Sequence, residues 1–151
     1  MSLCDDGRIR IATATTAEVR EIRHRVLRPG QPLGVLDSPD DERSVHLAAW
    51  DGDRVVGTVR ILPAGHTGDP EAWQLRSMAV DPEYQGQGIG RRLLEAVVEE
   101  ARRRGVGLLW ANARTSALGF YTKAGWQAHG EEFLHPASGL PHYVITRELR
   151  T

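Results

Sequence analysis

The sequence has a single cysteine, Cys4, few aromatic residues and almost no net charge. One cysteine cannot form a disulfide within the chain, so a disulfide-stapled fold is excluded and the composition suits a reducing cytosol. A net charge of -1 gives no reason to expect nucleic acid or an acidic membrane surface as a partner. No apolar run is long enough to span a bilayer, and the first residues lack the apolar core of a signal peptide. We therefore expect a cytoplasmic protein.

The remaining composition is that of an ordinary globular domain. The chain has 151 residues, of which 40% are hydrophobic and 26% are charged, and it contains no internal repeat. This length is enough to bury a core, so we expect one domain over residues 1–151. The histidines and the cysteine do not follow the spacing of zinc ligands, and no metal site is expected.

A glycine-rich stretch separates a short strand-like segment from a long segment with helical periodicity. Gly86, Gly88 and Gly90 lack a Cβ atom, so the backbone can turn tightly there and approach a ligand closely. The first N–H groups of the following helix have no intrahelical partner and carry partial positive charge. The order therefore predicts an anion site, with phosphate as the usual anion. Arg91 and Arg92 oppose the helix dipole, and a bound phosphate would explain their position.

Three interpretations of this stretch are open from its spacing. It fits an ordinary glycine-rich turn. A dinucleotide fingerprint needs G-x-G-x-x-G, and the spacing of Gly86, Gly88 and Gly90 differs; a P-loop is excluded because no Gly-Lys-Ser/Thr follows. The third interpretation is the pattern Q/R-x-x-G-x-G/A, which residues 85–90 (QGQGIG) fit.

In its context this pattern resembles the acyl-CoA-binding motif of the GCN5-related N-acetyltransferases, the GNAT family. The context is MAVDPEYQGQGIGRRLLEAV, residues 78–97. Residues 117–126 (ALGFYTKAGW) are similar to the family's later segment A-x-x-x-Y-x-x-x-G-F/W. The two motifs stand in the family's order, and the resemblance covers roughly residues 45–147. It implies acetyl-CoA (coenzyme A) as the cofactor.

The resemblance also implies how this cofactor is held. The pantetheine arm would pair like an added strand with the backbone of Met78 and Val80, and the N–H of Met78 would polarise the thioester carbonyl. Relatives often carry an asparagine seven positions before the motif tyrosine, where this chain has Arg114, so Asn112 is the candidate for that contact. The implied cofactor-binding residues are Met78, Ala79, Val80, Gln85, Gly86, Gln87, Gly88, Ile89, Gly90, Arg91, Asn112 and Tyr121.

The catalytic candidates follow from the same resemblance. Tyr121 matches the tyrosine that lies near the sulfur and protonates the leaving thiolate, although a core aromatic at a helix end is the alternative. Glu131 and His142 match a bacterial subgroup with G-E-x-F/Y and P-H near the C-terminus, and either is a candidate general base. A water relay stays open, as do four other side chains: His46, His66, Glu71 and Glu132.

Periodicity and turn signals predict the order strand, helix, strand, strand, strand, helix, strand, helix, strand, strand. The expected strands are residues 8–13, 45–50, 54–62, 73–80, 108–112, 126–133 and 142–148, and the expected helices start after Thr15, near Ile89 and at Ser116. This order predicts an α/β fold with a mixed, mostly antiparallel central sheet flanked by helices. The resemblance adds that the sheet is splayed in the middle, between the strands ending near Val80 and Asn112.

Two local features are expected before the second strand. Thr15 and Glu18 fit a capping box, followed by a helix with Val19, Ile22 and Val26 on one face and arginines opposite. Residues 29–44, rich in proline, glycine and acids, are expected to form a loop or a short irregular helix. This segment is either a solvated connection or, as the resemblance implies, a wall of the acceptor site.

The function implied is that of an N-acetyltransferase. It would move the acetyl group of acetyl-CoA to a primary amine of a small molecule or a protein, by direct attack in a ternary complex. The alternatives are a non-catalytic acyl-CoA-binding or sensing module on the same fold and a nucleotide binder. The oligomeric state is left open, with a homodimer as one alternative.

Overall fold

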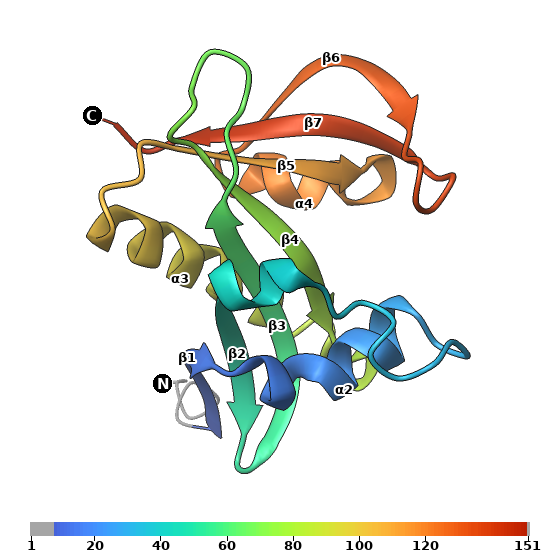
Figure 1. Ribbon diagram of the computed structural model, residues 1–151. Coiled ribbons are helices and arrows are strands. Elements are labelled where there is room, and N and C mark those ends of the chain that lie inside the picture. Colours follow the sequence, from blue (N-terminus) through green and yellow to red (C-terminus); the bar gives the residue numbers. More distant parts are fainter. Residues whose placement is uncertain (1–7, 151) are drawn as a thin grey trace. The chain divides into compact units, whose positions relative to one another are not determined.

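The computed structural model describes residues 8–150, so Cys4 lies outside the described residues. The chain divides into two compact units, Met1–Leu62 with Ser77–Glu100 and Pro63–Arg76 with Ala101–Thr151. The element order of Figure 1 agrees with the predicted order of strands and helices. One seven-stranded sheet has the strand order β1-β2-β3-β4-β5-β7-β6, which confirms the mixed, mostly antiparallel α/β fold.

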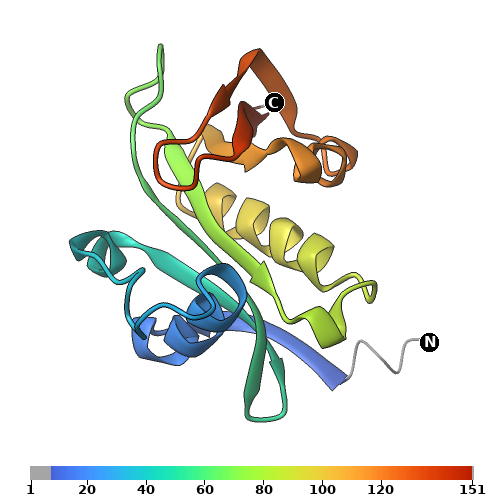
Figure 2. The ribbon, with the colours of Figure 1, turned by 90° about the vertical axis from the view of Figure 1, so that its right-hand side faces the viewer.

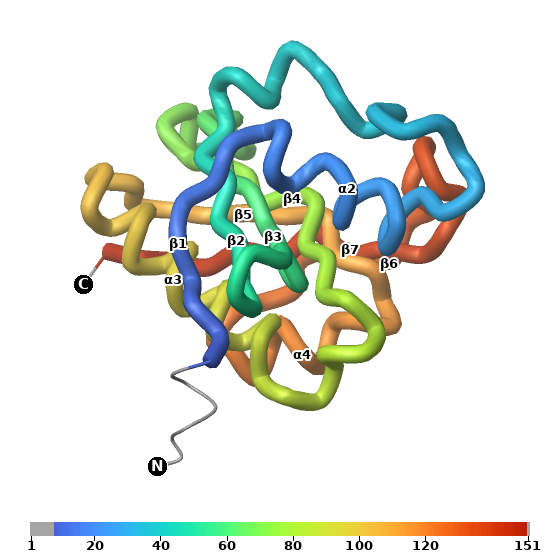
Figure 3. Tube along the Cα trace, turned by 90° about the horizontal axis from the view of Figure 1, so that it is seen from below, coloured from blue at the N-terminus to red at the C-terminus, as the bar shows by residue number. Residues whose placement is uncertain are grey.

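The first unit is built on three antiparallel strands, β1 (Ile9–Ala14), β2 (Val45–Asp51) and β3 (Arg54–Pro63). They lie side by side in the tube view of Figure 3. The β2–β3 hairpin forms at the predicted Asp-Gly turn, where Gly52 has φ 61°. In the ladder His46 pairs with Arg60, so both side chains lie on one face of the sheet.

Two helices, α2 (Thr16–Leu27) and α3 (Ile89–Arg103), cover opposite faces of these strands. A Cβ atom on Gly57 of β3 would stand 3.1 Å from Ile89 and 3.2 Å from Leu93, so the bare glycine lets α3 approach closely. Arg60, three residues along, faces the opposite side and the α2 face. Apolar residues of α3 recur at helical spacing, and five of them are buried: Ile89, Leu93, Leu94, Val97 and Ala101. Val98, at the same spacing, is half-buried.

The second unit contains β5 (Leu108–Arg114), β6 (Gln127–Leu134) and β7 (Pro141–Glu148), with β7 pairing antiparallel to both others. The short helix α4 (Leu118–Lys123) packs against this group of strands (Figure 1). The prediction that Ser116 caps this helix is wrong. A 3-10 turn, η3 (Thr115–Ala117), takes up Ser116, and α4 starts after Ala117 without a side-chain cap.

The strand β4 (Trp73–Val80) contributes to both units, with the division falling between Arg76 and Ser77. Its parallel ladder with β5 pairs Trp73 with Leu109 and Gln74 with Trp110. Within residues 8–150, no later residue of either strand continues this ladder. The pairing is therefore lost partway along both strands, in agreement with the expected splay of the sheet. None of the helices formed by residues 8–150 is long and apolar enough to cross a bilayer.

Candidate active site

The chain enters the glycine-rich loop through Asp81, the first residue after β4. Its buried carboxylate accepts hydrogen bonds from the Glu83 N–H at 2.9 Å, from Arg25 Nη1 at 2.8 Å and from Arg54 Nη2 at 3.1 Å. Burial acts to raise the pKa of Asp81, but these hydrogen bonds and the arginine charges outweigh it and lower the pKa. The carboxylate thus fixes the direction in which the 3-10 turn η2 (Pro82–Tyr84) leads into the loop (Figure 2).

The backbone N–H groups of the loop, from Gly86 to Arg91, have no hydrogen-bond acceptor among the described residues. Gly86 and Gly88 have φ 82° and 79°, and a Cβ at either position would meet open space. The first hydrogen bond into α3 runs from the Arg92 N–H to the Gly88 carbonyl at 3.0 Å. Among residues 8–150, no protein group accepts from the amides of Gly86 to Arg91. These donors and the positive end of the helix dipole suit a diphosphate.

The side chains around the loop have separate tasks. Gln85 Nε2 donates to the Val80 carbonyl at 3.3 Å and joins the loop back to β4. Arg92 Nη2 donates to the Ile9 carbonyl at 3.0 Å, so this guanidinium braces α3 against β1. Arg91 is the more exposed of the two arginines, with its side chain 78% accessible and a 3.7 Å contact to Glu95. Such an exposed pair contributes little, which leaves Arg91 available to an anion.

A strained residue lies in the middle of β4. Ser77 has φ 59°, and it is the one non-glycine residue with positive φ among residues 8–150. A left-handed residue inside a strand breaks the regular alternation and re-aims the following backbone groups, here those of Met78 to Val80. Such strain is typical of functional sites. Sequence reasoning missed Ser77, because nothing about a serine within a strand pattern predicts this conformation.

Tyr121 is a buried aromatic of the second unit. It packs edge-on against Phe120 at 5.1 Å and Trp126 at 5.8 Å between ring centroids. Burial raises the pKa of Tyr121 to about 12, and no described residue makes a hydrogen bond with its hydroxyl. The phenol therefore stays protonated at neutral pH with its donor unspent. It satisfies both interpretations, a core aromatic and a proton or hydrogen-bond donor.

His142 is held in one tautomer. It is buried on β7, and its Nδ1 lies 2.8 Å from the Leu140 carbonyl. Since a carbonyl only accepts, Nδ1 carries the proton and Nε2 keeps the lone pair in the neutral ring. The rings of His135 and Phe133 lie at 4.8 Å and 6.1 Å. A lone pair on Nε2 is what a general base needs in order to accept a proton.

The other two candidates of the second unit are less constrained. Glu131 is exposed, in the irregular part of β6 between His129 and Phe133. Its neighbour Glu132, and not Glu131, accepts a hydrogen bond from Thr115 Oγ1 at 2.7 Å. Asn112 is half-buried on β5, two residues before Arg114, which pairs with His142 in the ladder. The second unit thus aligns Asn112 and His142 on neighbouring strands. The catalytic or cofactor-binding roles of Tyr121, His142, Glu131 and Asn112 all stay predictions.

Comparison with known proteins decides the family. The sequence pattern of the acetyltransferase (GNAT) family matches residues 14–126. The chain belongs to the GNAT acetyltransferase family. The uncharacterized N-acetyltransferase YitI of Bacillus subtilis is 31% identical over 147 residues, which cover 95% of this chain and 98% of the relative. The GNAT acetyltransferases use acetyl-CoA as their acetyl donor.

Solved GNAT structures share the fold. The ribosomal-protein-S18-alanine N-acetyltransferase of Escherichia coli superposes with a TM-score of 0.75 at 21% identity, covering 95% of each chain. An aminoglycoside 6'-N-acetyltransferase complexed with coenzyme A superposes with a TM-score of 0.73 at 17% identity, covering 94% of this chain and 98% of that one. At these identities the likeness establishes the GNAT fold and no particular acceptor.

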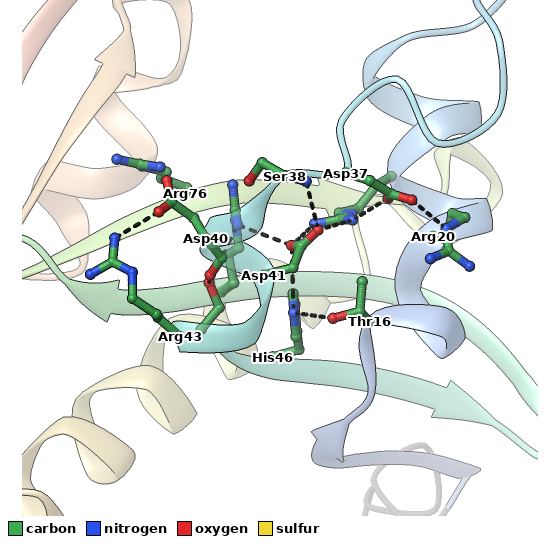
Figure 4. Close-up of polar contacts among 12 residues, drawn as sticks. Thr16, Arg20, Asp37, Ser38, Asp40, Asp41, Arg43, His46 and Arg76 are labelled. Carbon is green, nitrogen blue, oxygen red and sulfur yellow. Dashed lines mark hydrogen bonds and ion pairs between the residues drawn. The ribbon is translucent and has the colours of Figure 1, made fainter.

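This GNAT member fastens residues 29–44 with a buried ion network (Figure 4). Asp41, in the 3-10 segment η1 (Pro39–Arg43), accepts hydrogen bonds from Arg23 Nη1 at 2.9 Å and Arg60 Nη1 at 3.0 Å. Arg23 is only 1% exposed and also bonds Asp37 at 3.0 Å. The expectation that the arginines of α2 all face away from the core is wrong for Arg23. Carboxylates from the loop neutralise its charge and make burial tolerable.

His46 belongs to this network. Its Nε2 lies 3.1 Å from Thr16 Oγ1 and 3.7 Å from the Asp41 carboxylate. Burial, with the nearby charges of Arg23 and Arg60, lowers the pKa of His46 and keeps the ring neutral. A buried histidine whose Nε2 already contacts Thr16 and Asp41 has a structural role, which argues against His46 as the general base. The segment 29–44 is therefore anchored at Asp37 and Asp41, while Leu33 and Val35 are exposed, and its role as a wall of the acceptor site stays a prediction.

Proposed function

We propose that the protein is an N-acetyltransferase that transfers the acetyl group of acetyl-CoA to a primary amine. The acceptor is a small molecule or a protein, and the amine attacks directly while both substrates are bound. The observation that carries the proposal is the run of unspent amides from Gly86 to Arg91 at the start of α3. The chain keeps these donors unpaired although a single capping side chain would satisfy some of them, as at α2.

Acetyl-CoA supplies the activated thioester, and the chain supplies position and proton handling. The amides of the loop hold the diphosphate. The backbone of Met78, Ala79 and Val80, without a ladder partner in β5 among residues 8–150, holds the pantetheine arm as an added strand. In this proposal the Met78 N–H, directly after the kink at Ser77, donates to the thioester carbonyl, where a donor stabilises the developing negative charge.

The proton balance assigns roles to the second unit. The amine loses a proton as the new C–N bond forms, and the sulfur gains one as the C–S bond breaks. His142, with its Nε2 lone pair, takes the proton from the amine. A thiol has a pKa of about 8.5, well below the pKa of about 12 of Tyr121. Tyr121 therefore donates a hydrogen bond to the leaving thiolate, and solvent completes its protonation. Glu131 or a water relay is the alternative base.

The test has two stages. Calorimetric titration with acetyl-CoA, with NAD as the control ligand, is expected to give binding for acetyl-CoA alone, and absence of binding would contradict the proposal at its first step. Release of free thiol is then followed over an amine panel. The panel includes an aminoglycoside and a peptide with an N-terminal alanine, the acceptor classes named for the two solved relatives.

A non-catalytic acyl-CoA-binding module is the second candidate. It is favoured by the sequence of β4, which carries Gln74 and Arg76 and has no carboxylate that could serve as a general base. Tight binding of acetyl-CoA without thiol release across small amines, peptide N-termini and lysine side chains would select this alternative over the enzyme.

A further inference from the structure

Arg8, which immediately precedes β1, contacts the glycine-rich loop although it is not part of the loop. Its Nη2 donates to Gln87 Oε1 at 2.9 Å, and its guanidinium carbon lies 5.8 Å from the centre of the Tyr84 ring. Tyr84 ends the 3-10 turn before the loop, and Gln87 stands between the two left-handed glycines. The cation is thus fixed by residues on both sides of Gln85 and Gly86, although it lies far from them in sequence.

Three other arginines near the loop are already engaged, whereas Arg91 is exposed at the start of α3. Arg25 and Arg54 share the carboxylate of Asp81, and Arg92 donates to the Ile9 carbonyl. Arg8 forms no ion pair with any carboxylate of residues 8–150, and its one described hydrogen bond uses a single donor of its five. Asp51, which pairs with Ile9 in the strand ladder, accepts a hydrogen bond from the Tyr84 hydroxyl at 2.5 Å and does not pair with Arg8. Arg8 is therefore a positioned cation with donors to spare.

The chemistry of the proposed donor gives this cation a ligand. Coenzyme A carries a diphosphate and, separately, a phosphate monoester on its ribose. The amides of Gly86 to Arg91 suit the diphosphate, whose oxygens accept from backbone N–H groups. A monoester has up to two negative charges at neutral pH and prefers a guanidinium, which can offer two parallel donors.

We infer that Arg8 binds the ribose 3′-phosphate of coenzyme A and makes the protein select it over the 3′-dephospho form. Arg91, the exposed arginine at the start of α3, adds positive charge at the same loop. The inference rests on the proposed function, because it needs the diphosphate to sit on the loop. It adds a specificity-determining residue that lies outside both family motifs.

Calorimetric titration of the wild type and of Arg8→Gln with coenzyme A and with 3′-dephospho-coenzyme A tests this. The wild type is expected to bind coenzyme A about 10-fold more tightly than the dephospho form, as for one charge-assisted contact. Arg8→Gln is expected to reduce this ratio to about 2, through weaker binding of coenzyme A alone. Arg8→Lys keeps the charge and is expected to retain an intermediate ratio. The wild-type ratio should also shrink as salt is raised.

Arg10→Gln is the matched control. It removes the same charge two residues along β1, where Arg10 lies over the Trp50 ring at 5.5 Å instead of at the loop, and it should leave the ratio unchanged. Equal binding of both ligands by the wild type would overturn the inference while leaving the proposed function intact. So would an Arg8→Gln variant that weakens both ligands in the same proportion, because Arg8 would then act only by holding Gln87. Binding of neither ligand would overturn the proposed function itself.

Discussion

Helices α2 and α3 both begin in the first unit, but their first turns are built in opposite ways. At α2, Thr15 Oγ1 accepts from the Glu18 N–H at 3.2 Å, and Glu18 Oε1 accepts from the Thr15 N–H at 2.9 Å. At α3 the first turn has no acid, and the amides up to Arg91 have no acceptor among the described residues. A helix that only supports the fold closes its own N-terminus, whereas α3 leaves its donors for a ligand.

The same contrast divides the polar side chains. In the first unit the carboxylate of Asp41 is spent on two arginines, and burial, which acts to raise its pKa, is outweighed by their hydrogen bonds and charges, which lower the pKa. In the second unit Tyr121 is an equally buried residue, but its hydroxyl has no described hydrogen-bond partner, and burial raises the pKa to about 12. Polar groups that are paired within the protein should govern stability. Polar groups that have no partner among the described residues should govern binding and catalysis.

The largest effect is expected when a buried carboxylate that is paired with two arginines is removed. Asp41→Ala leaves the guanidinium groups of Arg23 and Arg60 buried without the carboxylate between them, and should lower the free energy of unfolding by about 3–5 kcal/mol. Asp37→Ala is the control: Asp37 is about one-third exposed, and its loss should cost less than about 1 kcal/mol. Urea unfolding measures both. A loss at Asp41 no greater than that at Asp37 would contradict the role given to the network.

The next effect converts α3 into a capped helix like α2. Gly88→Asp places a carboxylate at the cap position, where it would accept from the loop amides and repel a phosphate. Affinity for acetyl-CoA should fall about 100-fold, which corresponds to about 2.7 kcal/mol. Gly88→Asn has the same shape and similar tolerance of the left-handed φ, but no charge, and should weaken binding less. Calorimetry compares the two; equal losses would mean that strain, not charge, is responsible.

Removal of the Tyr121 hydroxyl, which has no described hydrogen-bond partner, should lower kcat without changing the free energy of unfolding. Tyr121→Phe is expected to lower kcat roughly 10–100-fold, at or below the lower end of general acid contributions, because a phenol of such high pKa donates only a hydrogen bond. The KM for acetyl-CoA and the free energy of unfolding should change little, since no described residue loses a partner. Tyr143→Phe, on β7 of the same unit, is the control. An unchanged kcat would return Tyr121 to the status of a core aromatic.

The smallest effect is expected at the closed helix. Thr15→Ala removes the side-chain half of the capping box and should lower the free energy of unfolding by about 1 kcal/mol. Acetyl-CoA affinity should be unchanged, because α2 makes no use of its N-terminus for binding. Thermal unfolding and calorimetry on the same variant measure both quantities. A clear loss of affinity would show that the two helix starts are not separable in function.

Local patterns predict much of this molecule and fail at identifiable points. The capping box at Thr15, the hairpin turn at Gly52 and the open start of α3 depend on neighbouring residues, so the sequence is enough to predict them. The burial of Arg23 depends on Asp41, which lies 18 residues away in an irregular segment, so helical periodicity assigns Arg23 to the wrong face.

The kink at Ser77 could not be predicted for a related reason. Serine has no preference for the left-handed region, so tertiary structure must impose this conformation on a strand that otherwise reads as regular. Arg8 was also missed as a site residue, because its contact with Gln87 spans 79 positions and no motif marks it. The site residues that sequence reasoning does find are those whose role is carried by the backbone or by a motif.

The division into two units gives the protein its own optical reporters. Of its four tryptophans, Trp50 belongs to the first unit, and Trp73, Trp110 and Trp126 belong to the second. Emission from a Trp50→Phe variant would therefore arise in the second unit alone, and its difference from the wild-type spectrum isolates the first. Fluorescence during denaturation can thus report whether both halves melt together or whether the half bearing the glycine loop melts separately.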